Sequence, residues 1–333
     1  MTKVKTKKNS DFWERNRKSN GYLLKKEIMK YGVSICRFFL LFGMCFLILQ
    51  PILNKISVSF MTQADLFNPS VINIPEHFTT ENYKLTAKIL DYKNTLINSI
   101  LVSLSASIIQ IAMATLVGYG FARFKFPFKN FWFACVLLVI LVPPQTIATS
   151  LHLHFRFFDI LGISQAMTGT TINLRSSPIP YYMMCFTCMG LKNGLYIYMI
   201  RQFFRNIPAE LEEAAYVDGC GTLMTFVRIM LPDAKPILTS CFLFSFVWQW
   251  TDGFYAGMFL GKIKMLAAGL STLGDALAAY IQSLTGLKNA VSVAYTNCIL
   301  ATGTLMIIMP LVIIYLFAQK GFVESISSSG IKM

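Results

Sequence analysis

Few residues in this sequence belong to the types that carry out chemistry, and their spacing assembles no active site. Cys185 and Cys188 form a lone C-x-x-C with no second pair and no nearby histidine, which favours apolar packing over a zinc or redox site. His152 and His154 would need further ligands to hold a metal. The sequence assembles no Ser-His-Asp set or carboxylate pair and contains no glycine-rich phosphate loop. We therefore expect a protein that is not an enzyme and that binds no cofactor or metal.

The most distinctive polar segment, residues 205–235, lies between two long apolar segments. Its acidic residues fall in the first turns of a predicted helix, where negative charge is favourable against the helix dipole: Glu210, Glu212 and Glu213. Pro208 suits the first helical position. Leu211, Ala214 and Ala215 recur at i, i+3 and i+4 and form a narrow stripe of mostly small side chains. The pattern predicts a short helix with a face for close docking.

The end of this helix is also marked in the sequence. Gly219 and Gly221 are expected to stop it through a left-handed residue, and a second helix over 223–230 is expected to stop at Pro232. A helix that lies on a membrane surface usually carries Lys and Arg on its polar face, whereas this one carries acidic residues. A protein partner with a basic cleft therefore fits this segment better than anionic lipid.

The composition indicates what surrounds this segment. Of 333 residues, 55% are hydrophobic and only 14% are charged, against about 25% in a soluble domain. The net charge is +14, but 11 of the 30 Lys and Arg residues lie before residue 38, ahead of the first apolar run or, for Arg37, near its start. Cations clustered beside a membrane span indicate orientation and contact with membrane lipid, so we expect no nucleic-acid binding. The sequence predicts an all-α polytopic membrane protein.

Six apolar segments come close to the length of about 20 residues that a membrane span needs. They are residues 31–53, 96–121, 131–150, 181–204, 237–260 and 293–317. The first is too long and too far from the N-terminus for a cleaved signal, so we expect a retained span. The fourth is interrupted by a charge and two glycines at 190–194. Either it is one span with a break, or a short helix from Asn193 to Phe204 lies against protein rather than lipid.

Loop charges predict the orientation. The N-terminal arm, the second-to-third connection and the fourth-to-fifth connection are basic, and with six spans all three fall on one side, which the positive-inside rule makes cytoplasmic. Both termini are then cytoplasmic. We expect a basic arm over 1–30, a six-helix domain over 31–319 that contains the loop 205–235, and a tail over 320–333. The stretch 262–288 on the opposite side is expected to form a surface helix or a re-entrant piece.

Several residues inside the spans could line a translocation path or could serve only in helix packing. Small residues recur every four positions in the second span, which suits close helix packing within one subunit better than a dimer face: Ser99, Ser103, Ser107, Ala114, Gly118 and Ala122. Pro143, Pro144 and Pro310 should bend their helices, either along a translocation path or as passive kinks. Asp252 is a candidate pathway residue together with Gln249 and Thr251, or else a solvated residue at the outer interface.

The acidic segment matches a known pattern: E-A-A, three residues, G, nine residues, I, one residue, L-P. It resembles the cytoplasmic loop of the membrane subunits of bacterial ATP-binding-cassette (ABC) importers. The stretches 120–127 and 201–213 and the tail 319–332 are similar to the carbohydrate-uptake class, in particular to the second permease subunit of maltose-transporter-type systems. The resemblance covers roughly residues 30–333. One departure is Thr251-Asp252, where family members usually carry Asn-Asp.

The resemblance implies the importer permease (type I ABC importer) fold in a bacterial cell membrane. It implies three kinds of partner: a dimer of cytoplasmic ATPases, a second permease subunit in a heterodimer, and an extracytoplasmic solute-binding protein. The loop residues implied to couple to the ATPase are Glu210, Leu211, Glu212, Glu213, Ala214, Ala215, Asp218, Gly219, Ile229, Leu231 and Pro232. The tail residues implied to reach the ATPase pair are Ser329, Gly330, Ile331 and Lys332.

The function expected on this basis is ATP-driven import of a sugar, oligosaccharide or glycoside. An importer for a peptide, polyamine or osmolyte is the alternative within transport, because the coupling loop is shared across classes. A secondary transporter that works alone is a different class. It would need ion-coupling acids in at least two spans, and Asp252 is the only candidate in the apolar segments.

Overall fold

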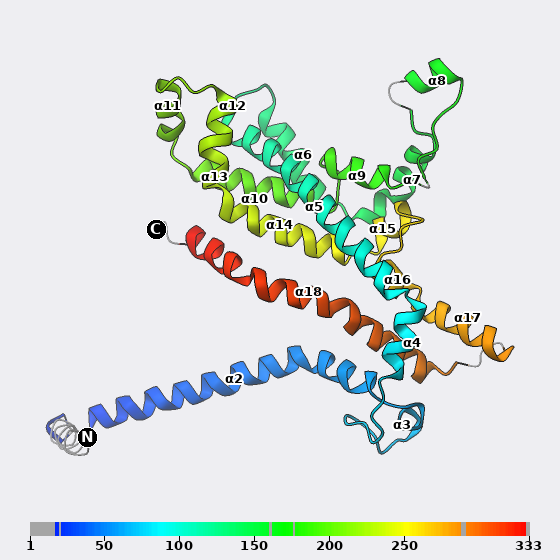
Figure 1. Ribbon diagram of the computed structural model, residues 1–333. Coiled ribbons are helices and arrows are strands. Elements are labelled where there is room, and N and C mark those ends of the chain that lie inside the picture. Colours follow the sequence, from blue (N-terminus) through cyan, green and yellow to red (C-terminus); the bar gives the residue numbers. More distant parts are fainter. Residues whose placement is uncertain (1–16, 20, 160–161, 176, 288–290, 331–333) are drawn as a thin grey trace.

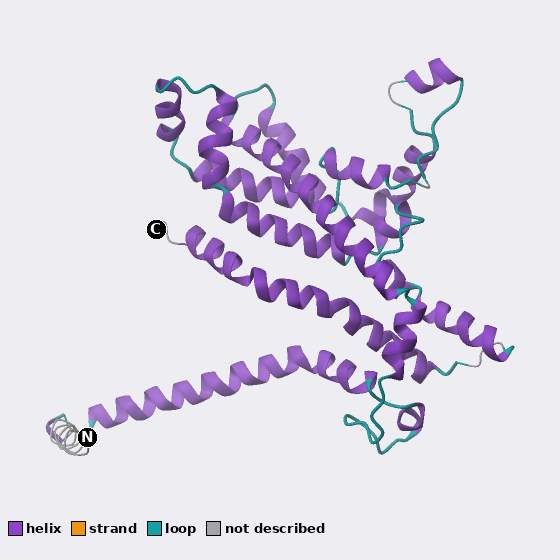
Figure 2. Cartoon of the chain, in the orientation of Figure 1, coloured by secondary structure: helices purple, strands orange, loops and turns teal. Residues whose placement is uncertain are grey.

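The computed structural model describes residues 17–19, 21–159, 162–175, 177–287 and 291–330, which form helices and loops with two isolated β-bridges and no strand (Figure 2). The first half contains α2 (Tyr22–Ser59), α3 (Gln63–Phe67), α4 (Glu81–Ile89), α5 (Tyr92–Arg123), α6 (Lys129–Leu141), η1 (Pro144–Ile147), α7 (Ala148–Arg156) and α8 (Ile163–Thr168). The second half contains α9 (Ile179–Phe186), α10 (Asn193–Asn206), α11 (Glu210–Val217), α12 (Thr222–Thr225), the π-helical turn η2 (Phe226–Met230), α13 (Leu231–Asp233), α14 (Lys235–Trp250), α15 (Phe254–Phe259), α16 (Leu266–Ser271), α17 (Leu273–Thr285) and α18 (Val293–Gly330).

Three helices of the described residues, α2, α5 and α18, are long and apolar enough to cross a membrane. Two bent pairs raise this number to five if each pair is one span: α6 with η1 and α7, and α12 to α13 with α14. The fourth expected span is not one helix. It is divided into α9 and α10 by residues 187–192, and α10 packs along α5, α6 and α14 with Tyr196, Ile200 and Phe204 fully buried. The structure therefore shows both the break at residues 187–192 and the packing of the following short helix against protein.

Backbone conformation explains this break. Cys188 and Lys192 both have positive φ angles, of 59° and 61°, which end a helix because only glycine adopts that region without a penalty. The carbonyl that would be left without a partner at Leu191 accepts a hydrogen bond of 2.7 Å from Gln110 Nε2. The break is therefore held by a polar side chain of α5.

Prolines in the spans have unequal effects. The third span turns by 101° between Leu141 and Pro144, where the two prolines remove backbone donors, as predicted. At Pro310, α18 continues as one helix without a break, and the predicted bend at this residue stays a prediction. The long helix α18 buries its first half against α2, α4 and α14, and this packing holds it together across the proline.

The stripe of small residues in α5 packs inside this chain. Ser99, Ser103, Ser107 and Ala114 are fully buried, and a Cβ added at Gly118 would lie 2.9 Å from Ile200 of α10. The small side chains let α10 and α14 approach α5 closely, and such contacts drive helix association in a membrane. The expectation of packing within one subunit is confirmed.

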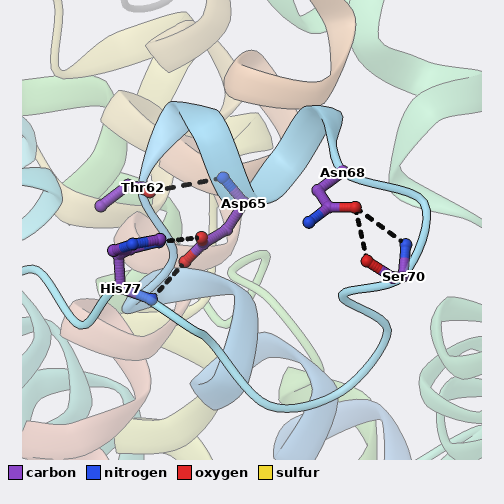
Figure 3. Close-up of polar contacts among 5 residues, drawn as sticks. All are labelled: Thr62, Asp65, Asn68, Ser70 and His77. Carbon is purple, nitrogen blue, oxygen red and sulfur yellow. Dashed lines mark hydrogen bonds and ion pairs between the residues drawn. The ribbon is translucent and has the colours of Figure 1, made fainter.

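Figure 1 shows that the start of α2 and the end of α18 lie at the same end of the molecule as α11, whereas α3 and α17 lie at the opposite end. At that opposite end, the stretch 262–288, expected to be a surface helix or a re-entrant piece, contains the half-buried helix α16 and the helix α17, which has an exposed side. The loop between α2 and α4 is closed there by Asp65, whose two carboxylate oxygens lie 2.8 Å from His77 Nδ1 and 2.9 Å from His77 N (Figure 3). The loop is thus a compact cap on the end that lies away from α11.

Candidate functional site

The acidic helix α11 begins at Glu210, so Pro208 lies two residues before it rather than at the predicted first helical position. Glu210, Glu212 and Glu213 occupy its first turn, and the helix ends at Gly219, whose φ of +81° is the predicted left-handed conformation. Cys220 N donates to Ala215 O at 2.9 Å, which satisfies a carbonyl at the helix end. Gly221 has an ordinary φ of −74°, so only Gly219 supplies the turn.

Glu212 faces the body of the protein. Its Oε1 accepts a hydrogen bond of 2.8 Å from the Tyr119 hydroxyl, and its Oε2 lies 3.3 Å from Arg123 Nε. Arg123 Nη2 also donates to Ile207 O at 2.8 Å, in the turn before α11. Glu212 is only 7% exposed. Burying a carboxylate costs much free energy unless the group is paired and hydrogen-bonded, as it is here. These contacts attach α11 to the end of α5.

The ring of Tyr119 strengthens the same attachment. It lies 5.3 Å from the ring of Phe204 in α10 and 4.7 Å from that of Phe226 in η2, measured between centroids. The two aromatic partners come from the segments that enter and leave the acidic loop, so both ends of the loop are held on α5. Aromatic pairs at these separations stabilise a fold beyond the area that they bury.

The opposite face of the loop is open. The outward side chains combine carboxylates with apolar groups: Glu210, Leu211, Glu213, Ala214, Val217, Asp218 and Leu223 are all exposed, with Val217 at 88% and Leu223 at 79%. The predicted stripe of Leu211, Ala214 and Ala215 is divided, because Ala215 is buried and the other two point outward. An exposed apolar patch rimmed by charge is typical of a protein contact.

The second half of the loop ends close to where the sequence predicts. The helical segment α12, η2 and α13 ends at Asp233, one residue after the predicted stop at Pro232, and the chain turns by 75° before α14. Pro232 sits at the first turn of α13, where a missing amide donor costs nothing. Ile229 and Leu231 are half-buried and Pro232 is exposed, so this half presents a mixed surface beside α11.

The three predicted path residues lie near the end of α14 in different environments. Gln249 is 1% exposed and donates to Gln110 Oε1 at 3.0 Å, while its Oε1 accepts from the Tyr181 hydroxyl. Thr251 is exposed, and its hydroxyl donates to Val247 O. Asp252 is 6% exposed rather than solvated, and its carboxylate accepts from the amides of Phe254, Tyr255 and Ala256 at 2.9 to 3.3 Å. Asp252 therefore caps α15, a role that sequence analysis missed.

Gln110 is the further residue that sequence analysis missed. It is fully buried, accepts from Ser245 Oγ at 2.6 Å as well as from Gln249, and donates to Leu191 O. An amide in the middle of the long apolar segment of α5 was the available signal, because a polar group at that depth must find partners within the protein. Gln110 joins α5, α14 and the break of the fourth span.

The remaining predicted residues lie at the chain end and in the outer loop. Ser329 and Gly330 form the last residues of α18, and Ile331 and Lys332 lie outside the described residues. Ligand atoms of Asp65, Glu76 and His77 lie within 4.8 Å of one another, a grouping compatible with a metal. Both oxygens of Asp65 already accept hydrogen bonds from His77, so the pair closes the loop without an ion.

The fold and the acidic loop together define a class of protein. Long apolar helices, one expected span divided into two helices and a polar loop at one end are features of a multi-pass membrane protein. Residues 110–328 match the family described as "Binding-protein-dependent transport system inner membrane component", and the chain belongs to this family. It is therefore a multi-pass inner-membrane permease of an ABC transport system, a transporter subunit rather than an enzyme.

Individual relatives agree with this assignment. The chain is 27% identical over 287 residues to the probable ABC transporter permease protein YurM of Bacillus subtilis, covering 86% of this chain and 84% of that one. It is 26% identical over 293 residues to the arabinooligosaccharides transport system permease protein AraQ of Halalkalibacterium halodurans, covering 86% and 92%. A solved structure of a bacterial ABC transporter involved in the import of the acidic polysaccharide alginate matches with a TM-score of 0.65, 20% identity and coverage of 86% and 95%, and it shows the same fold.

Proposed function

We propose that this chain is one of two permease subunits of an importer for an oligosaccharide or glycoside. A dimer of cytoplasmic ATPases drives it, a second permease completes the path, and an extracytoplasmic solute-binding protein delivers the solute. Family membership and the named sugar permeases among its relatives support this proposal. The chain then crosses the membrane six times, with the fourth crossing made by α9 and α10 together, and both termini are cytoplasmic.

The observation that carries the proposal is the division of α11 into two faces. Glu212 and Ala215 attach the helix to its own subunit, while Glu213, Ala214 and Val217 face outward. The outward face, with Leu211, Asp218 and the nearby Ile229, Leu231 and Pro232, is the proposed contact with the ATPase. The Tyr119–Glu212–Arg123 contacts, which we name the α5 anchor, then transmit motion of the loop to α5. Rigid-body motion of this kind moves transporters between inward- and outward-facing states.

Two further assignments belong to this proposal. Ser329 to Lys332 form a second contact with the ATPase pair, because the end of α18 lies at the same end of the molecule as α11 (Figure 1). Gln249, Thr251 and Asp252 stay a prediction for the translocation path. Since one relative is named for arabinooligosaccharides and the solved structure concerns an acidic polysaccharide, the proposed solutes include both neutral and acidic oligosaccharides.

The decisive experiment reverses one outward charge. Glu213→Lys should prevent assembly with the ATPase dimer and abolish ATP-dependent uptake, since unpairing an interfacial charge costs about 3 to 5 kcal/mol. The measurement is co-purification of the ATPase together with uptake into proteoliposomes. Glu81→Lys is the matched control, because Glu81 is an exposed carboxylate in α4, far from α11. Normal assembly and uptake with Glu213→Lys would rule out the coupling assignment.

A further inference from the structure

Three interruptions of the membrane segments meet around one cavity of about 390 Å³. The bend of the third span, the break of the fourth and the two helices on either side of the turn between α14 and α15 all contribute to its wall. The lining includes Pro144, Ile147, Gly190, Lys192, Trp248 and Tyr255. Irregular backbone at membrane depth is tolerated where it is buried in protein or lines a cavity, and discontinuous helices are where transporters place their binding sites.

The cavity lies deep relative to the acidic loop. α10 has 14 residues and therefore rises about 21 Å from Lys192 to the loop. Trp248 is 13 residues beyond Lys235 at the start of α14, which gives about 20 Å by the same rise. With the six crossings of the proposed function, both estimates place the cavity inside a hydrocarbon core of about 30 Å. Lys192 is therefore a cation at membrane depth.

The ammonium group of Lys192 has an unusual partner. It lies 4.9 Å from the centroid of the Trp248 ring, a cation–π contact. The ion pairs recorded for the described part of the chain join other residues: His77 to Asp65, Lys84 to Glu81 and Arg123 to Glu212. Asp252, the acidic residue in the same region of the chain, is occupied by three backbone amides. The positive charge of Lys192 thus lacks a carboxylate partner within the described structure.

The backbone of Lys192 also adopts an energetically unfavourable conformation. Its φ of 61° lies in the left-handed region, and non-glycine residues in that region are found preferentially at ligand clamps and switches. Next to it, Gly194 lets α10 touch α6, because an added Cβ would lie 2.7 Å from Val136 O. The break therefore holds the lysine firmly at the cavity wall.

From these observations, and resting on the proposed function, we propose that this cavity binds an anionic oligosaccharide unit, such as a uronate, during transport. Lys192 pairs with its carboxylate, and the exposed face of Trp248 supplies an apolar platform for the sugar ring. A mostly apolar pocket with a few placed polar groups is the usual form of a small-molecule site, and a charge at membrane depth is by default functional. The lysine selects the acidic substrates of the importer.

The test uses the complete transporter, with its ATPase, second permease and solute-binding protein, in proteoliposomes. Uptake is measured for trigalacturonate and for its carboxyl-reduced, neutral counterpart. We expect uptake of the acidic sugar, a fall of about tenfold or more in its uptake with Lys192→Gln, and recovery with Lys192→Arg. Trp248→Leu should lower the same uptake. Lys262→Gln, which changes an exposed lysine that does not line the cavity, should leave it unchanged.

Each other result overturns one of the two proposals. Uptake of the neutral sugar alone, or equal uptake of trigalacturonate by Lys192→Gln and the wild type, would refute the assignment of Lys192 while leaving the importer function intact. Loss of basal ATPase activity in Lys192→Gln that Lys192→Arg fails to restore would mean that Lys192 acts only in folding. A phospholipid found in native mass spectra of the wild type and lost in Lys192→Gln would assign the cavity to lipid. ATP-dependent uptake of neither sugar would refute the uronate site, whereas the lack of ATP-dependent uptake of any oligosaccharide or glycoside would contradict the proposed function as well.

Discussion

The Tyr119 hydroxyl donates a hydrogen bond of 2.8 Å to the carboxylate of Glu212, and so joins the membrane helix α5 to the first turn of the acidic helix α11. Both residues are buried, at 4% and 7% exposure, and the two are 93 positions apart in the sequence. The neighbouring residue Glu213 points to the outside. One carboxylate of the pair therefore fixes the loop to its own subunit, and the other is free for a partner.

Removing this hydroxyl should weaken the loop. Tyr119→Phe keeps the aromatic contacts but leaves a buried carboxylate oxygen without its donor, and hydrogen bonds to charged groups contribute about 1.5 to 3 kcal/mol. We expect a lower melting temperature of the purified complex and less sugar taken up per ATP hydrolysed. Tyr198→Phe, at a half-exposed tyrosine of α10, is the control and should change neither quantity. If Tyr119→Phe takes up as much sugar per ATP hydrolysed as the wild type, the α5 anchor has no role in coupling.

The ion pair of the α5 anchor can be tested by a double-mutant cycle. Arg123→Gln leaves the Glu212 carboxylate buried without its cation, which costs about 3 to 5 kcal/mol. Adding Glu212→Gln removes that charge, so the double variant should be more stable than Arg123→Gln alone. Thermal unfolding of the detergent-solubilised complex measures both changes. Strictly additive destabilisation in the double variant would show that the two side chains do not interact.

Gly219 should be intolerant of a side chain for backbone reasons. No atom lies within 4 Å of an added Cβ, but the φ of +81° penalises any other residue by about 1 to 2 kcal/mol. Gly219→Ala should therefore loosen the end of α11 and reduce ATP-dependent uptake. Gly221→Ala, at a glycine with an ordinary φ and equally open space, is the matched control. The measurement is proteoliposome uptake, and equal losses in both variants would exclude the left-handed turn as the cause.

Gly194 should be intolerant for a steric reason instead. An added Cβ would lie 2.7 Å from Val136 O and 2.8 Å from Ile140 Cγ1, so α10 must move away from α6. Overpacking of this kind costs about 1 to 3 kcal/mol. Gly194→Ala should lower the melting temperature, whereas Gly43→Ala in α2, with no atom within 4 Å, should not. If Gly194→Ala melts like the wild type, α10 and α6 are not in close contact.

The loop between α2 and α4 should depend on pH. Burial opposes charge on Asp65, but the hydrogen bonds from His77 outweigh it and lower the pKa of Asp65. The hydrogen bond to Asp65 raises the pKa of His77 above its ordinary 6.5. The contribution of His77 is complete below pH 6.5 and is lost as pH rises through its raised pKa. That of Asp65 is complete above pH 3.8 and is lost as pH falls through its lowered pKa.

Hydrogen exchange over residues 62–78, corrected for the intrinsic rate, measures this dependence. Protection should be greater at pH 6 than at pH 8.5 in the wild type. His77→Gln should remove the difference, because its amide does not titrate in this range. The same protection at both pH values in the wild type, or a difference that persists in His77→Gln, would be inconsistent with the Asp65–His77 contact.

By itself, the sequence determined the class of the protein and the place of its acidic loop. Apolar segments of membrane length, the acids at the start of a predicted helix and the glycine at its end are local properties, and local geometry fixes their consequences. The turn at Gly219 and the bend at Pro143 and Pro144 were predictable for this reason.

Only the tertiary structure decided which side of each element meets the rest of the chain. Helical periodicity gives the angle between Glu212 and Glu213 but not which of them faces α5, because that depends on where Tyr119 and Arg123 lie. The division of the fourth span similarly depends on Gln110. This residue donates to the carbonyl of Leu191 at the break, 81 positions further along the sequence. Asp252 became a cap, and Lys192 a cation at a cavity, because long-range packing places their partners there.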